Sequence, residues 1–112
     1  VRSGGGISVA NILTSGINQI SSNLPSSFQL YQNYPNPFNP TTKIRFDISK
    51  QSDVELTVYN AGGKSVSTIV NCNLAPGEYE TEFSARDLSS GIYFIKLTAG
   101  KFVMTKKLIL LK

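Results

Sequence analysis

Apolar and polar residues alternate at a period of two over most of this chain. In TTKIRFDI, Ile44, Phe46 and Ile48 fall on one face of an extended chain and charged residues fall on the other. The same alternation runs through three further segments, VELTVYN at 54–60, EYETEFS at 78–84 and IYFIKLTA at 92–99. This period is typical of β-strands with one buried face, whereas no apolar stripe persists at the helical period. The pattern therefore predicts an all-β protein.

Turn signals interrupt the alternation about every eight to twelve residues, which is the spacing typical of an antiparallel β-sandwich. The clearest signals are AGG at 61–63, Pro76-Gly77, RDLSSG at 86–91 and Gly100. Glycine supplies the positive φ that tight turns need. We count about seven strands, at 28–32, 41–48, 54–60, 64–70, 78–84, 92–99 and 101–111.

Residues 1–27 have a different composition from the sandwich that we assign to residues 28–112. They contain a glycine triplet and many serines and asparagines, as a linker does, but also more aliphatic side chains than a solvated linker needs. We expect part of this extension, with Ile7, Val9 and Ile12, to pair as a strand either on its own domain or on a neighbour. Because the chain starts at Val1, we interpret it as a processed product or as the C-terminal part of something longer.

A run of prolines, NYPNPFNP at 33–40, precedes the cleanest strand pattern. Pro35, Pro37 and Pro40 fix φ and remove three backbone donors, so this segment cannot be a central strand. Asn36 and Asn39 can bond their own backbone in turns. We therefore expect a rigid corner that aims the strand at 41–48 and blocks edge-on association there, with Tyr34 and Phe38 packed against it.

The charge distribution favours neither a nucleic-acid partner nor a membrane span. The formal net charge is +4, and no apolar run reaches transmembrane length. From position 96 to the end there are no acids and five lysines, namely Lys96, Lys101, Lys106, Lys107 and Lys112. Since these lysines are spread along apolar strands without an arginine cluster, a solvated or gatekeeping face explains them better than a nucleic-acid site.

The residues that catalysis or metal binding usually needs are largely missing. There is no histidine, and Cys72 is the lone cysteine, so we interpret it as a structural thiol. Glu78, Glu80 and Glu82 share one strand face, but no loop has the ligand spacing of a calcium site. The aromatic residues are mostly needed for a core, which leaves a carbohydrate-binding face as a weak alternative. We expect no enzyme activity, cofactor or small-molecule substrate.

Several motifs, in this order, resemble a known family. They are Pro35-Asn36-Pro37, with Pro40 after it, Gly77 with Tyr79, Leu88 through Gly91-Ile92-Tyr93, Gly100, and a terminal strand from Lys107 to Lys112. From about Phe28 to Lys112 the chain resembles the type A C-terminal sorting domain of the type IX secretion system of Bacteroidetes and their relatives. That family is in turn similar to the Ig-like domain of flagellar hook-capping proteins. The resemblance implies a seven-stranded Ig-like sandwich.

The resemblance also implies a function and partners. Such domains direct secreted cargo from the periplasm through an outer-membrane translocon, after which a sortase-type protease often removes the domain and attaches the cargo to the cell surface. Recognition would fall on the last two strands, and the residues are Gly91, Tyr93, Lys96, Gly100, Lys106, Lys107, Leu108, Ile109, Leu110, Leu111 and Lys112. A terminal strand suits this role because it can present an edge for β-augmentation. Cleavage would fall within Ser15 to Ser27.

A second hypothesis keeps the domain in place after export. The aliphatic residues 7–13 would be donated as a strand to an open sheet edge, so that the chain would be a structural subunit of a surface assembly or filament. This hypothesis implies self-association, which the sorting hypothesis does not need.

Overall fold

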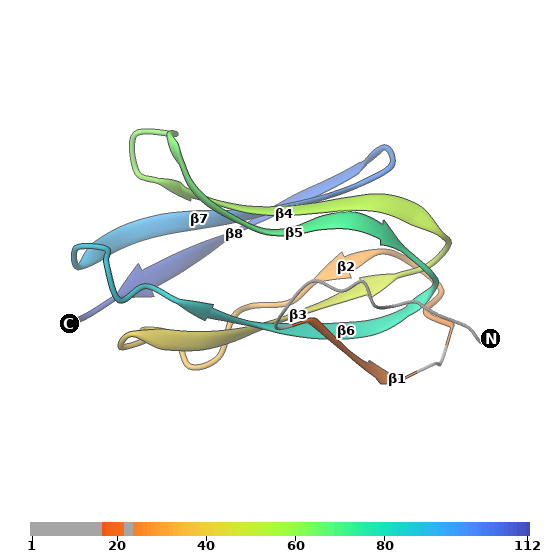
Figure 1. Cartoon of the computed structure of the whole chain (residues 1–112), viewed down its shortest axis with the longest axis horizontal. Coiled ribbons are helices and arrows are strands. Elements are labelled where there is room, and N and C mark those ends of the chain that lie inside the picture. The colour runs from red at the N-terminus through yellow and green to blue at the C-terminus, as the bar shows by residue number, and fades with distance from the viewer. Residues whose placement is uncertain (1–16, 22–23) are drawn as a thin grey trace.

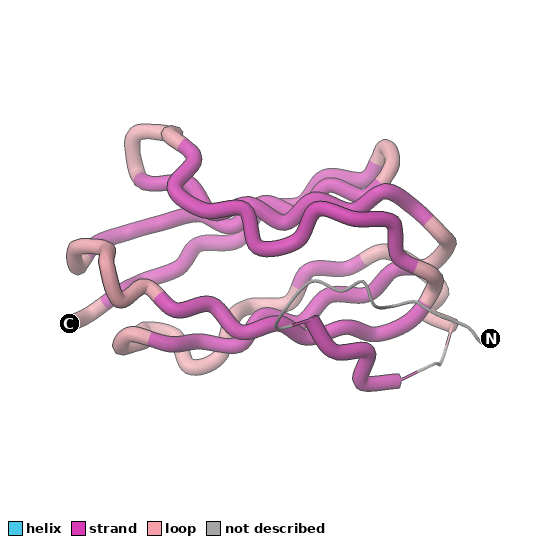
Figure 2. Tube along the Cα trace, in the orientation of Figure 1, coloured by secondary structure: helices cyan, strands magenta, loops and turns pink. Residues whose placement is uncertain are grey.

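The computed structural model describes residues 17–21 and 24–112, and these residues form strands, turns and loops without a helix (Figure 2). The eight strands are β1 (Ile17–Ser21), β2 (Gln29–Leu30), β3 (Thr41–Ile48), β4 (Ser52–Asn60), β5 (Ser65–Leu74), β6 (Gly77–Ser84), β7 (Gly91–Ala99) and β8 (Phe102–Leu110). The described residues include no helix that could cross a membrane. The all-β prediction is confirmed.

The strands form two four-stranded sheets that lie face to face (Figure 1). One sheet has the order β1-β6-β3-β2 and the other has the order β5-β4-β7-β8. Every strand pair in both sheets is antiparallel. The molecule is therefore the antiparallel sandwich that the period-two pattern predicts, with β8 at one edge of its sheet.

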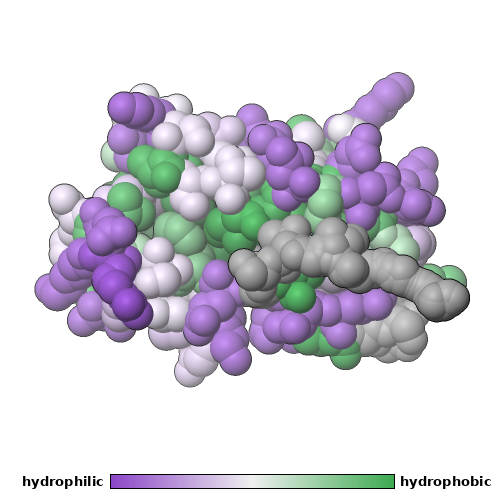
Figure 3. All heavy atoms as spheres, viewed as in Figure 1, coloured by the Kyte–Doolittle hydropathy of each residue, from purple (hydrophilic) through white to green (hydrophobic). Residues whose placement is uncertain are grey.

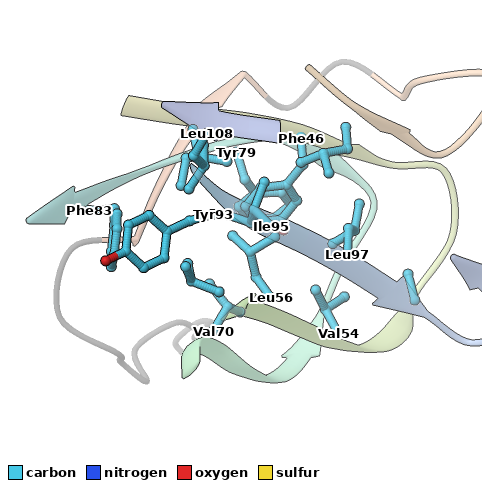
Figure 4. Packing of buried hydrophobic residues seen from close by; sticks show 14 of the residues in the cluster. Phe46, Val54, Leu56, Val70, Tyr79, Phe83, Tyr93, Ile95, Leu97 and Leu108 are labelled. Atoms are coloured by element: carbon cyan, nitrogen blue, oxygen red, sulfur yellow. The ribbon is translucent and has the colours of Figure 1, made fainter. Parts of the chain in front are cut away.

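The inward faces of both sheets supply the core. The central strands β3 and β4 bury the residues that the alternation assigns to the interior, because Ile44, Phe46, Leu56 and Val58 have no exposed surface. Aromatic rings from neighbouring strands meet between the sheets, and the rings of Phe46 and Tyr79 stack with centroids 5.6 Å apart. Figure 4 shows these side chains converging from both layers. Each large side chain buried in this way stabilises the fold by about 1.5–3 kcal/mol.

The N-terminal extension, residues 1–27, contributes a strand to the first sheet. β1 pairs antiparallel with β6 and places Ile17 opposite Thr81. Ile17 packs against the core, which explains why this segment pairs at all. The proposed strand donors Ile7, Val9 and Ile12 lie outside the described residues.

Candidate recognition surface

The strand expected to be recognised, β8, is an edge strand. It pairs with β7 along its whole length, from Ala99 opposite Phe102 to Gly91 opposite Leu110. No other named strand of the described chain pairs with its second side. An edge strand presents unpaired N–H and C=O groups to which another chain can add.

The predicted recognition residues divide into exposed and buried sets. Tyr93, Leu108 and Leu110 belong to the core, so their side chains cannot contact a partner of the folded domain. Lys96, Lys106 and Ile109 are half-buried, and the exposed members are Gly91, Gly100, Lys107, Leu111 and Lys112. Leu111 is 55% exposed although it directly follows the fully buried Leu110. A folded β8 therefore offers only part of the expected set.

The proline corner covers the C-terminal half of the β8 edge. The Phe38 N–H donates to the Ile109 carbonyl at 2.9 Å, and the Leu111 N–H donates to the Phe38 carbonyl at 3.0 Å. These bonds form a parallel bridge between Phe38 and Leu110. The Asn36 Oδ1 accepts a bond from the Ile109 N–H at 3.1 Å. Phe38 lies among three prolines but, unlike them, has a backbone N–H. It can therefore pair with the edge of β8 as a strand residue does.

The corner also pairs with β3, the strand that we predicted it to cover. Tyr34 and Lys43 exchange two backbone bonds, at 3.0 and 2.9 Å. The contact with the edge of β8, in the opposite sheet, is one that we did not predict. The aromatic prediction is right for Phe38, which is in the core, and wrong for Tyr34, which is 80% exposed. The chain passes from the edge of one sheet to the edge of the other here, so the corner joins the two sheets on this side.

A small polar network holds the corner in shape. Asn33 is buried, and its Nδ2 donates to the Pro35 carbonyl and to the Thr42 Oγ1, each at 3.0 Å. The Thr42 hydroxyl also donates to the Pro35 carbonyl, at 2.9 Å. Among the described residues, no backbone N–H donates to the Pro35 carbonyl, and these side-chain donors satisfy it instead.

The Gly-x-Tyr motifs have structural roles. The Tyr79 hydroxyl donates to the Ala75 carbonyl at 2.7 Å, and the Tyr93 hydroxyl donates to the Ser89 carbonyl at 2.7 Å. In each case a tyrosine near the start of a strand fixes the turn four residues before it. Gly77 and Gly91 begin those strands. These two motif tyrosines thus order the turns before β6 and β7.

The outer face of the first sheet carries a charged ladder. Arg45 lies opposite Glu80 and Lys43 lies opposite Glu82 in the β3–β6 register. At the edge of the ladder the Tyr31 hydroxyl donates to Asp47 at 2.5 Å, and the Arg45 guanidinium lies 5.7 Å from the centre of the Tyr31 ring. The hydrogen bond to Asp47, followed by burial and the negative charge of that carboxylate, raises the pKa of Tyr31.

Within the described residues, no group of three or more Cys, Asp or Glu side chains could hold a metal ion. Cys72 is half-buried against the core and forms no disulfide. Figure 3 shows hydrophilic side chains spread over both ends of the molecule, with apolar surface between the two layers. The arrangement offers hydrogen-bonding edges and charged side chains, which suit contact with another protein.

Fold and surface together define a small all-β domain whose terminal strand lies at a sheet edge. A family model described as the secretion system C-terminal sorting domain matches residues 32–111, and the chain belongs to this family. A search of the curated proteins finds no match. The family consists of sorting signals for type IX secretion, a class that interacts with the secretion machinery and marks proteins for export to the cell surface or the extracellular space.

Sequence reasoning missed the side chains that touch the β8 edge from elsewhere in the chain. Besides Asn36, the Gln32 Nε2 donates to the Lys107 carbonyl at 2.7 Å. Both residues looked like turn or strand-end residues, and the Asn36 contact spans 73 positions. Lys50, between β3 and β4, lines the same hollow as Gly100. No local pattern marks any of these contacts.

Proposed function

We propose that this domain directs an upstream cargo through the outer-membrane translocon of the type IX system and on to attachment at the cell surface. The C-terminal end of β8 would be the element that the translocon recognises. The observation that supports this is the position of Lys107, Leu111 and Lys112, which are exposed at a sheet edge next to fully buried leucines. Lysines at such a surface favour an acidic receptor and speed encounter with it.

A fusion of a reporter protein to the N-terminus of the full chain tests this function in a host that has the secretion route. Deleting Lys107–Lys112 would be a poor test because it removes the core residues Leu108 and Leu110. The better variant is Leu111→Asp, with Ala61→Asp in the turn between β4 and β5 as its control, since both side chains are exposed and both variants add the same charge. We expect the wild type and Ala61→Asp to be exported and Leu111→Asp to accumulate in the periplasm. Retention of the wild-type fusion would contradict the proposed function.

We also propose that a sortase-type protease removes the domain by cutting before β2. The range from Ser15 to Ser27 includes β1, whose pairing with β6 keeps Ile17–Ser21 out of a protease cleft. Leu24 is 75% exposed and belongs to no strand, so cleavage is expected near it. Mass spectrometry of the mature cargo should place its new C-terminus between residues 22 and 27. A terminus upstream of Ile17 would contradict this assignment.

The second candidate, a retained subunit with donated residues 7–13, draws support from the open edge of β5. This strand is ten residues long and pairs only with β4 among the described strands. A donated strand would fit such an edge. The full chain should then form oligomers that disappear when Ile7, Val9 and Ile12 are changed to Asp. A monodisperse monomer across the concentration range would contradict the candidate.

A further inference from the structure

The outward edge of β8 has two parts with different surroundings. The backbone N–H and C=O groups of alternate residues point to the same side of a strand. The Ile109 carbonyl points away from β7 and bonds Phe38 of the corner, so the backbone groups of Val103, Thr105 and Lys107 also point away from β7. Among these three residues, only Lys107 has a hydrogen-bond partner on this side within the described chain, because its carbonyl accepts from the side chain of Gln32. Among residues 17–21 and 24–112, therefore, nothing pairs with this edge from Val103 to the Lys107 N–H, whereas the corner occupies it beyond that point.

The surface is hollowed beside the start of this open edge. A hollow of about 470 Å³ lies between the turns at 49–52 and 99–102. Its apolar side is formed by Phe28 and Phe102, whose rings stack with centroids 5.4 Å apart. Lys50 and Lys101 line it as well, and both side chains are exposed. It thus combines an apolar wall with two cationic groups.

All charged residues of β8 and of the turn before it are lysines. Lys101, Lys106 and Lys107 lie on or next to it, and no acid occurs from Lys96 to the end of the chain. Asp53, which follows Ser52 in the chain, is not among the residues that line the hollow, and its carboxylate accepts a bond from Asn73 of β5 at 3.0 Å. An added strand would therefore meet several positive charges, which favours an acidic one.

We propose that an extended acidic segment of the receiving protein adds to β8 along the open edge from Val103 to Lys107, with an acidic group in the hollow between Lys50 and Lys101. This inference rests on the proposed sorting function and adds a site of backbone pairing on β8 to the exposed side chains of Lys107, Leu111 and Lys112 at its C-terminal end. The proline corner sets the far limit of the added strand, because Asn36 and Phe38 already occupy the edge beyond Lys107. The competing explanation is that the lysines only protect the edge from aggregation.

Proline substitution tests the pairing. Thr105→Pro or Val103→Pro removes an outward N–H while the bonds to β7 come from neighbouring residues, and proline is tolerated at such edge positions. The matched control is Asn71→Pro on the edge strand β5. Asn71 lies opposite Glu55, and the backbone groups of Glu55 point to β7, so the Asn71 N–H points away from β4, toward the outer side of β5. With the reporter fused to the full chain, we expect about a tenfold or greater loss of export for the β8 variants and none for the control. Unchanged export by β8 variants that keep the wild-type melting temperature would overturn the inference.

Photo-crosslinking gives an answer even if proline unfolds the domain. A benzoylphenylalanine at Val103, which is 56% exposed, should crosslink to a component of the secretion machinery during export. The same probe at Asn71 of β5 should not. Equal crosslinking from both positions, or none from Val103 in an exported fusion, would overturn the inference. A wild-type fusion that is not exported would contradict the sorting function itself, so the two failures are distinguishable.

Charge reversal tests the chemistry of the partner. Lys101→Glu places a negative charge at the hollow, and Lys64→Glu is the control because Lys64 is exposed in the turn between β4 and β5. Each variant changes the net charge equally. We expect at least a threefold lower export rate for Lys101→Glu only. Equal rates for the two variants would show that the lysines serve as edge protection and would overturn the assignment of an acidic partner.

Discussion

At the scale of single residues, the bond from Tyr31 to Asp47 makes stability depend on alkaline pH. The pKa of Tyr31 is raised in the folded state by this bond first, so the neutral form of the phenol is favoured by folding. The stabilisation is fully present below the ordinary tyrosine pKa of about 10 and is lost as pH rises through the higher folded value. We expect Tyr31→Phe to lower stability by about 1 kcal/mol at pH 8, because Asp47 is buried and loses a donor. Melting curves of both proteins from pH 8 to 11 should converge; a constant gap would contradict this account.

The buried amide of Asn33 gives a second residue-scale prediction. Asn33→Ala removes the amide that donates to the Pro35 carbonyl and to the Thr42 hydroxyl, and it leaves the Pro35 carbonyl with one partner fewer. We expect destabilisation by about 2 kcal/mol. Asn39→Ala is the control, since that side chain is exposed and should change stability by less than about 0.5 kcal/mol. Urea unfolding measures both, and equal midpoints would show that the network contributes nothing.

At the scale of elements, the corner and β8 behave as one unit. Asn36→Ala removes the acceptor of the Ile109 N–H, whereas Asn36→Asp keeps an acceptor oxygen at the same place. Loss of about 1 kcal/mol of local stability corresponds to roughly fivefold faster amide exchange. Exchange measured residue by residue should therefore speed up at Ile109 in the alanine variant and hardly change in the aspartate variant. The Val103 and Thr105 amides should exchange fast in all three proteins.

At the scale of the whole molecule, some of the C-terminal residues are needed for folding and others are free to be recognised. Leu110 has no exposed surface, so Leu110→Ala should cost about 2–5 kcal/mol and lower export through unfolding. Leu111→Ala should leave the melting temperature nearly unchanged, because the Leu111 side chain is half in solvent. Thermal melts of the purified full chain, compared with export of the fusions, separate the two effects. A large loss of stability in Leu111→Ala would contradict the division.

The parts of this fold that were predictable depend on local patterns. Ile44 and Phe46 are placed correctly because the period of a strand is visible within a few residues. The bond between Asn36 and Ile109 joins positions 73 residues apart, and a residue next to prolines gives no sign of such a partner. The exposure of Tyr34 was unpredictable for the same reason, since it depends on which way a tertiary corner turns. The sequence therefore predicts strands and their faces better than the contacts between edges.

The unequal attachment of the two end strands has a mechanical consequence. β1 is held by one short ladder to β6, whereas β8 has a nine-residue ladder to β7 and further bonds to the corner. If a receptor grips β8 while the cargo upstream is pulled, tension runs along the chain and reaches β1 first. We expect β1 to peel from β6 before the other strands separate, which would lengthen the tether to the cargo and leave the gripped sheet intact.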